Sequence, residues 1–75
     1  MTQARVCVHP TIEFLHDTRR RKGLTRTQVS ARSGYSVRAI EYWEWGWRTP
    51  SLESLIGYAG ALGYDLTLTP KEGSR

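Results

Sequence analysis

Residues 23–55 have the sequence GLTRTQVSARSGYSVRAIEYWEWGWRTPSLESL, and this stretch decides the fold. Its first signal is the pair Thr25 and Gln28, which have the spacing of a capping box. In that arrangement the Thr hydroxyl accepts a hydrogen bond from an amide of the first helical turn, while the Gln side chain reaches back to the cap. The pattern predicts a helix that starts at Thr25 and runs to about Ser33.

A second helix is predicted directly after the first. Gly34 can adopt the left-handed backbone conformation that ends a helix without steric cost. Ser36 has a side chain suited to cap the next helix, which is predicted to run from about Val37 to Trp45. Gly46 is placed to end that helix. The stretch therefore contains two short helices joined by a tight turn.

The tryptophans of this stretch require a choice between helix and strand. Trp43, Trp45 and Trp47 fall at every second position, and aromatic alternation is typical of a strand. The helix is favoured because no pairing strand is joined by a short turn, and because Ile40 and Trp43 give the helix a buried side. The opposite side of this helix is then exposed, and helical spacing assigns to it Arg38, Glu41, Tyr42 and Trp45, with Val37 at the boundary.

Helices are also predicted on either side of this pair. An earlier one covers about residues 11–22, with Ile12 and Leu15 as its apolar pair and basic residues at its C-terminal end. A later one is predicted to begin with Thr49 as its cap and Pro50 as its first helical position. The apolar stripe of this later helix consists of Leu52, Leu55, Ile56, Ala59 and Leu62.

The two ends of the chain have a different pattern. Residues 65–69 (DLTLT) alternate in the manner of a short strand, which Pro70 closes. Residues 4–9 (ARVCVH) fit either a short strand or a loose arm. We therefore divide the chain into an N-terminal arm or strand (1–10), a helical domain (11–63) and a C-terminal strand and tail (64–75).

Length and charge limit the classes of function. A chain of 75 residues forms one small domain with little room for an enclosed catalytic cleft, so an enzyme is not expected. Eleven Lys and Arg residues oppose seven Asp and Glu residues, for a formal net charge of +4. Eight of the basic residues lie between Arg19 and Arg48, together with only two acidic ones. A polyanionic partner is therefore expected at the middle of the chain.

Cysteine content and hydropathy indicate a cytoplasmic protein without cofactors. The single cysteine, Cys7, excludes an internal disulfide bond. No apolar run approaches the roughly 20 residues of a membrane span, and the N-terminus lacks the apolar block of a signal peptide. Cys7, His9 and His16 lack the spacing of a known metal site, so neither a metal nor another cofactor is expected.

The order of these features resembles the phage repressor and Cro-like family of helix-turn-helix DNA-binding proteins, also called the XRE type. The positions that match the family pattern are Leu15, Arg19, Gly23, Leu24, Thr25, Ser30, Gly34, Tyr35, Ser36, Ile40, Trp43, Glu44, Gly46, Pro50, Leu52 and Leu55. The chain departs from the usual residues at Arg26, Val29 and Ser30, where Gln, Leu and Ala are common. The resemblance implies an all-α fold, a compact bundle of four to five short helices containing the helix-turn-helix, to which the alternation in residues 65–69 adds a short C-terminal β-strand.

The resemblance also implies which residues contact DNA. In this family the second helix of the pair lies in the major groove, so that Val37, Arg38 and Tyr42 face base edges. The flanking phosphates are expected to contact Thr25, Arg26, Ser36, Trp45 and Arg48. Arg38 suits its role because a guanidinium group pairs with O6 and N7 of guanine, a contact worth roughly 1 to 3 kcal/mol of discrimination. Glu41 either accepts a hydrogen bond from a cytosine amino group or neutralises Arg38 in the free protein.

Several of these residues have a structural alternative. Arg38 can be a solvated surface charge, and Val37 can pack against the preceding helix. Trp45 can bury its ring against the stem of Arg48 or against the helix predicted after Pro50 instead of donating to a phosphate. The resemblance also implies that Arg19 and Glu44 form an ion pair, which makes Arg19 structural rather than a contact to DNA.

The expected function is sequence-specific binding of double-stranded DNA by a transcriptional repressor. One recognition helix covers few base pairs, so a homodimer on a palindrome with half-sites about 10 bp or a multiple apart is expected. Leu66 and Leu68, with Val6 and Val8, either form strand edges that pair between protomers or cover their own helices. An antitoxin that binds its operator and a toxin protein is the alternative function. A protein-interaction module without DNA binding is a third hypothesis.

Overall fold

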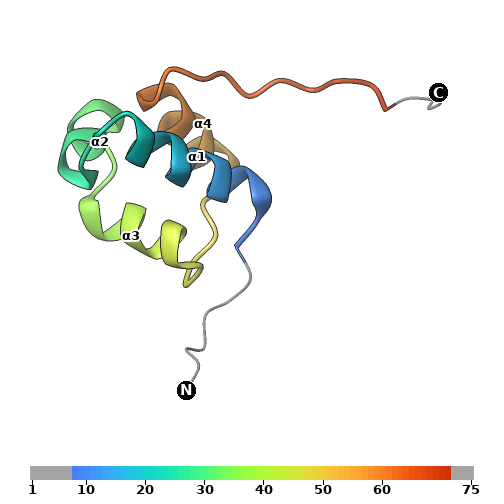
Figure 1. Ribbon diagram of the computed structural model, residues 1–75. Coiled ribbons are helices and arrows are strands. Elements are labelled where there is room, and N and C mark those ends of the chain that lie inside the picture. The colour runs from blue at the N-terminus through green and yellow to red at the C-terminus, as the bar shows by residue number, and fades with distance from the viewer. Residues whose placement is uncertain (1–7, 72–75) are drawn as a thin grey trace.

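Four helices account for most of residues 8–71, which are the residues that the computed structural model describes. They are α1 (Pro10–Arg21), α2 (Arg26–Ser33), α3 (Val37–Trp45) and α4 (Leu52–Ala61) (Figure 1). The all-α fold predicted from the sequence is confirmed, and the tryptophan-rich segment is helical through Trp45. Of the arm or strand predicted over 4–9, residues 4–7 lie outside the described part, whereas Val8 and His9 form neither a strand nor a helix.

Side chains cap the first three helices at their N-termini. The hydroxyl of Thr25 accepts a hydrogen bond from the amide of Gln28 at 3.1 Å, and the Gln28 side chain accepts one from the amide of Thr25 at 2.8 Å. The predicted capping box is therefore present. Ser36 caps α3 by accepting from the amide of Ala39 at 3.0 Å. At the start of α1, His9 acts as the cap, one position before Pro10.

Gly34 ends α2 and Gly46 ends α3. Gly34 has φ 85° and Gly46 has φ 83°, both in the left-handed region that strains other residues. The amide of Gly34 donates to the carbonyl of Ser30, which closes α2. The turn predicted between the two helices is thus built as the sequence indicates.

The start of α4 was predicted wrongly. Thr49 was expected to cap the helix and Pro50 to be its first residue, but Ser51 is the cap and Leu52 begins the helix. The hydroxyl of Ser51 accepts a hydrogen bond from the amide of Ser54 at 3.1 Å. Ser is at least as good a cap as Thr, and it stands nearer to the apolar residues of the helix. The loop between α3 and α4 is correspondingly longer.

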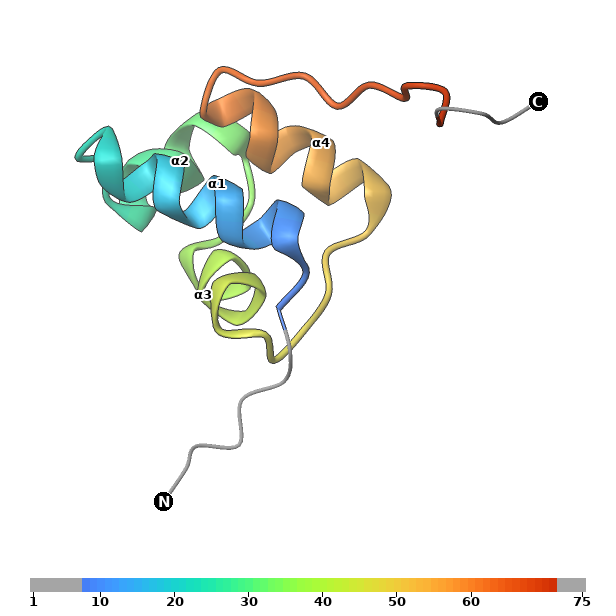
Figure 2. The ribbon, with the colours of Figure 1, turned by 45° about the vertical axis from the view of Figure 1, so that its right-hand side comes forward.

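The core lies where α2 packs against α3 and α4, and where α1 packs against α3 (Figure 2). Its buried members are Leu15, Val29, Ile40, Trp43, Tyr58, Ala59 and Leu62. Ile40 is 0% exposed and Trp43 is 6% exposed, so the inward orientation predicted for these two residues is confirmed. Because both lie on α3, the opposite side of that helix is turned toward solvent.

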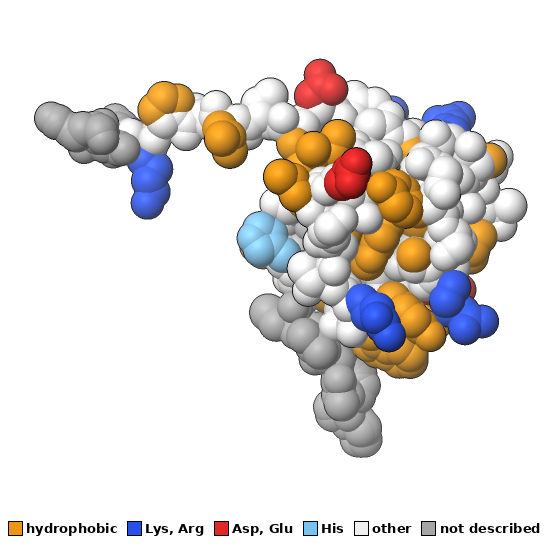
Figure 3. Space-filling model, turned by 180° about the vertical axis from the view of Figure 1, so that it is seen from behind, with side chains coloured by type: hydrophobic (Ala, Val, Ile, Leu, Met, Phe, Trp, Pro, Cys, Tyr) orange, Lys and Arg blue, Asp and Glu red, His pale blue; other side chains and the backbone are white. Residues whose placement is uncertain are grey.

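The apolar stripe predicted for α4 is correct only in part. Leu52 and Ile56 are 70% and 50% exposed, whereas Tyr58, which the prediction omitted, is completely buried. Tyr58 and Ala59 of the helix and Leu62 at its C-cap are buried, and Leu55 is partly buried; these four positions also have helical spacing. Tyr58 was overlooked because its hydroxyl group is polar, and that hydroxyl finds a partner inside the protein. Hydrophobic side chains consequently remain at the surface on the face seen in Figure 3.

The strand predicted over 65–69 is absent: residues 64–71 belong to no sheet and extend away from the helices (Figures 1 and 2). A strand needs a neighbour to satisfy its amides and carbonyls, and no segment within 8–71 provides one. Leu66 packs against the core, whereas Leu68 is 99% exposed.

Candidate nucleic-acid interface

The outward face of α3 begins at its capped N-terminus. Arg38 is the second residue of this helix, and its side chain is 72% exposed. Its only ion pair within the described part of the chain is a long one, because its Nε lies 3.9 Å from Oε1 of Glu41. Val37 is partly buried and Ser36 is exposed. The guanidinium group of Arg38 therefore lies at the surface beside the N-terminus of α3.

Glu41 lies between two arginines. Its carboxylate is 3.9 Å from Nε of Arg38 and 3.9 Å from a terminal nitrogen of Arg26. These distances are too long for strong hydrogen bonds, but they are short enough for electrostatic attraction. In the free protein Glu41 thus offsets part of the positive charge of this face, which is one of the two roles considered for it from sequence.

Aromatic side chains gather at the C-terminal end of the same face. The ring centroids of Tyr42 and Trp47 are 5.6 Å apart, and those of Trp45 and Trp47 are 5.1 Å apart. The guanidinium carbon of Arg48 lies 5.6 Å from the Tyr42 ring, within reach of a cation–π interaction. Tyr42, Trp45 and Arg48 are sequence-predicted site residues that the fold brings together.

Trp47 was not among the predicted site residues. The sequence places it after the glycine that ends α3, so helical spacing did not locate its side chain. The structure places its ring against Tyr42 and Trp45, and the side chain is 58% exposed. The sequence signal that includes Trp47 is the alternating run of tryptophans, which was used only to choose between helix and strand.

Thr25 and Arg26 at the start of α2 are engaged within the protein. Thr25 is exposed and its hydroxyl closes the capping box. Nε of Arg26 donates to Oε1 of Glu44 at 2.9 Å, and the Arg26 side chain is only 28% exposed. The guanidinium carbon of Arg26 also lies 5.7 Å from the centre of the Trp45 ring. Arg26 therefore links α2 to α3, a role that the sequence did not suggest.

Glu44 is the centre of a buried polar network. Arg19 donates to it twice, from Nε to Oε2 at 2.9 Å and from Nη2 to Oε1 at 3.0 Å. The remaining terminal nitrogen of Arg19 donates to the carbonyl of Leu24 at 2.8 Å. The hydroxyl of Tyr58 donates to Oε2 of Glu44 at 2.5 Å. With Arg26 included, residues of α1, α2 and α4 all bind one carboxylate of α3.

This environment shifts the pKa values of Glu44, Tyr58 and His16. Burial raises the pKa of the Glu44 carboxyl group, but the hydrogen bonds from Arg19, Tyr58 and Arg26 outweigh burial and hold it below its ordinary value. Burial and the hydrogen bond to Glu44 raise the pKa of Tyr58. His16, whose Nε2 lies 3.7 Å from Glu44, has a pKa lowered by burial and by nearby arginines, against the attraction of Glu44. Glu44 is therefore charged and His16 neutral near pH 7.

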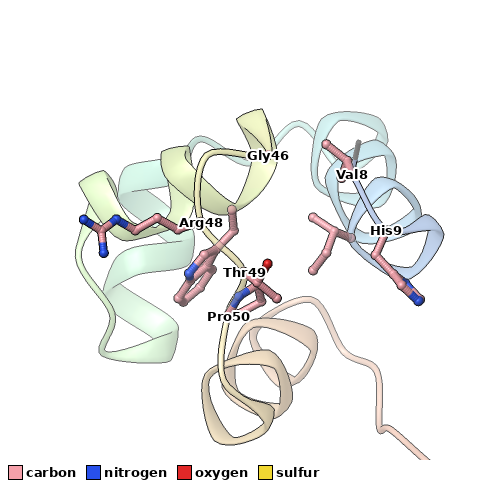
Figure 4. A pocket seen from close by; sticks show the side chains of 8 residues that line it. Val8, His9, Gly46, Arg48, Thr49 and Pro50 are labelled. Carbon is pink, nitrogen blue, oxygen red and sulfur yellow. The ribbon is translucent and has the colours of Figure 1, made fainter. Parts of the chain in front are cut away.

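A small cavity lies between the start of α1, the end of α3 and the loop before α4 (Figure 4). Its volume is about 40 Å³, which suits a water molecule rather than a cofactor. Figure 4 shows that the Arg48 side chain points away from this cavity, along α3. Among residues 8–71, no three His, Cys, Asp or Glu side chains are arranged to hold a metal ion. The described helices are too short and too polar to cross a membrane.

Comparisons with known proteins agree with the fold. A regulator of Sinorhizobium fredii, described as the uncharacterized HTH-type transcriptional regulator y4dJ, is 47% identical over 45 residues. That alignment covers 60% of this chain, and the chain spans only 58% of the length of that relative. The crystal structure of the restriction-modification controller protein C.AhdI from Aeromonas hydrophila superposes with a TM-score of 0.65 at 29% identity, covering 69% of this chain and 79% of that one.

The family comparison covers most of the chain. The helix-turn-helix family matches residues 15–68, which include α2, α3 and the turn between them. The resemblance that the sequence suggested is thereby confirmed. The protein belongs to the XRE-type helix-turn-helix family of DNA-binding transcriptional regulators.

Proposed function

We propose that this protein binds double-stranded DNA at specific sequences, with α3 in the major groove, and thereby represses transcription. The observation that carries the proposal is the position of Arg38. Its guanidinium group is exposed on the second residue of α3 and only weakly held by Glu41. A guanidinium group in this place can pair with O6 and N7 of guanine. Val37 and Tyr42 lie on the same face and would contact neighbouring bases, and Glu41 would accept from a cytosine amino group.

The buried network supports the proposal because it fixes the orientation of α3. Glu44 on α3 binds Arg19 of α1, Arg26 of α2 and Tyr58 of α4. A helix that is held by three neighbours through one carboxylate has little freedom to rotate. The side chains on its opposite face are therefore positioned before DNA arrives, which lowers the entropic cost of binding.

Phosphate contacts are proposed at the two ends of the reading face. Ser36 and Thr25 lie at the N-termini of α3 and α2, where free amides and the helix dipole favour an anion. Arg48 and Trp45 lie at the other end. Arg26 is a weaker candidate than the sequence suggested, because its Nε is already bound to Glu44.

We further propose that the protein acts as a homodimer in the cytoplasm, since one α3 helix covers few base pairs. Strand pairing through Leu66 and Leu68 does not support this dimer, because residues 64–71 form no strand. The exposed Leu52 and Ile56 on α4 offer an apolar surface instead. The antitoxin alternative relied on the C-terminal strand, which is absent, and neither relative is described as an antitoxin, so an antitoxin function is not supported.

The test is selection of bound duplexes from a random pool, followed by titration of the selected site against salt. The proposal predicts one recurring motif with two related halves, and an affinity that falls steeply as salt rises. Recovery of no motif, with weak binding at every salt concentration, would contradict it. Sedimentation of the protein with the selected duplex then gives the number of protomers per site.

A further inference from the structure

A group of rings lies at the end of the reading face, and its most exposed member, Trp47, has no role in the proposed contacts to base edges. The group consists of Tyr42, Trp45 and Trp47, and we call it the aromatic corner. Trp47 is 58% exposed, more than Phe14 at 46% or Tyr64 at 40%. A large ring that stays in water forgoes the burial that normally stabilises it, so its position indicates a ligand.

The rings of the aromatic corner hold one another in place. The planes of Trp45 and Trp47 meet at 65°, with their centroids 5.1 Å apart. The Tyr42 ring lies 5.6 Å from the Trp47 centroid and is tilted by only 36° from its plane. Trp47 is thus supported from two directions although it follows the end of α3. A supported and exposed indole is a platform on which a second flat ring can stack without first ordering the protein.

Positive charge accompanies the rings. The guanidinium carbon of Arg48 lies 5.6 Å from the Tyr42 ring, and Arg48 is exposed. Its side chain makes no hydrogen bond or ion pair with another residue in the described range 8–71, so it is available to an anion. The combination of a flat ring and an exposed cation fits a nucleotide, which carries both a flat base and a phosphate.

We propose that the aromatic corner binds an unpaired nucleotide of single-stranded DNA, with the base stacked on Trp47 and a phosphate beside Arg48. Bases within a duplex show only their edges, because neighbouring bases cover their faces. An unpaired base exposes a face, which is what an indole recognises. This site shares Tyr42, Trp45 and Arg48 with the proposed duplex interface, but stacking of an unpaired base on Trp47 goes beyond duplex reading by α3.

The experiment compares two labelled single strands of about 12 nucleotides, a length near that of known single-strand sites. One is an oligothymidylate, and the other has the same phosphates but abasic sugars. Affinity is measured by anisotropy of the label, and stacking by quenching of tryptophan fluorescence. The wild-type protein is expected to bind the oligothymidylate more tightly and to show quenching with that strand alone.

Three variants locate the effect. Trp47→Ala should weaken oligothymidylate binding by about 5- to 100-fold, toward that of the abasic strand, because one base stack is lost. Trp47→Phe should retain part of the preference, since an aromatic face remains. Phe14→Ala is the matched control, because Phe14 is an exposed aromatic residue of α1 whose ring pairs with Tyr64, away from the aromatic corner. It should leave both affinities unchanged.

Two results would overturn the proposal. Equal wild-type affinity for the two strands, including no measurable binding to either, would show that the site does not recognise a base. If Trp47→Ala weakened the affinity for the selected duplex and for the oligothymidylate by the same factor, Trp47 would pack on a DNA backbone rather than on a base. Circular dichroism of each variant checks that the helices are retained. Absence of a duplex motif would contradict only the proposed regulator, not the aromatic corner.

Discussion

Arg19 and Glu44 are separated by 25 residues in the sequence, and their side chains form two hydrogen bonds, of 2.9 and 3.0 Å, beneath the core. Both residues are buried, at 8% and 1% exposure. The pair joins the C-terminal half of α1 to α3. Because α3 carries the proposed reading face, this contact connects the stability of the fold to its function.

Loss of Arg19 should destabilise the protein strongly. In Arg19→Ala the Glu44 carboxylate remains buried with fewer partners, and breaking a buried pair in this way costs about 3 to 5 kcal/mol. The free energy of unfolding, measured by urea denaturation, should fall by that order. Arg20→Ala is the control, because Arg20 is exposed on the next position of α1, and it should change stability by less than about 0.5 kcal/mol. Equal stability of the two variants would mean that the pair does not contribute.

Acid should lower the stability of the protein in two steps. The folded pKa of Glu44 lies below its ordinary value, so the unfolded chain takes up this proton first as the pH falls. The stability that Glu44 contributes is present above its unfolded pKa and is lost as the pH falls through the folded pKa. The folded pKa of His16 is also lowered, so the unfolded chain again binds the proton first. The stability therefore begins to fall near the ordinary histidine pKa of about 6.5.

The two steps can be separated by denaturation at a series of pH values. His16→Gln should remove the loss of stability just below neutral pH and keep the loss at lower pH. Glu44→Gln should be less stable at neutral pH and should show a weaker further loss in acid. Stability of the wild type that stays constant or rises between pH 7 and pH 4 would contradict the signs given for both groups.

Gly57 and Gly60 of α4 should respond oppositely to substitution by alanine. A Cβ atom on Gly57 would lie 2.8 Å from Cε2 of Tyr35, whereas one on Gly60 would meet nothing within 4 Å. The Tyr35 ring is itself packed edge-on against Trp43, so it has little room to move. Gly57→Ala should cost about 1 to 3 kcal/mol through overpacking, and Gly60→Ala should gain up to about 1 kcal/mol in helix propensity. A gain for both in thermal denaturation would show that α4 does not approach Tyr35 so closely.

The sequence predicted those features that depend on neighbours along the chain. The Thr25 capping box, the cap at Ser36 and the turn at Gly34 are each built from residues a few positions apart, and the structure contains all three. The inward orientation of Ile40 followed from helical spacing alone. Local signals failed at the start of α4, where Thr49 was preferred to a serine two positions later, and in residues 65–69, where alternation predicted a strand that the structure lacks.

Among features that depend on packing between distant helices, the Arg19–Glu44 pair was expected only from the family resemblance, and the other partners of Glu44 were not predicted. Tyr58 and Arg26 both bind Glu44, but nothing in their own surroundings in the sequence points to that carboxylate. Their partner is decided by how α2 and α4 lie against α3. The exposed ring of Trp47 depends in the same way on the path of the loop after α3.

The central claim is that the outward face of α3 reads bases, and Arg38 tests it most directly. Duplexes selected from a random pool by Arg38→Ala are compared with those selected by the wild type and by Arg48→Ala. Arg38→Ala should lose the preference for guanine at one position of each half-site, at a cost of roughly 1 to 3 kcal/mol for the wild-type sequence. Arg48→Ala should weaken binding to all sequences alike and keep the motif. An unchanged motif for Arg38→Ala, in a variant that is folded and binds DNA, would contradict the assignment of this face.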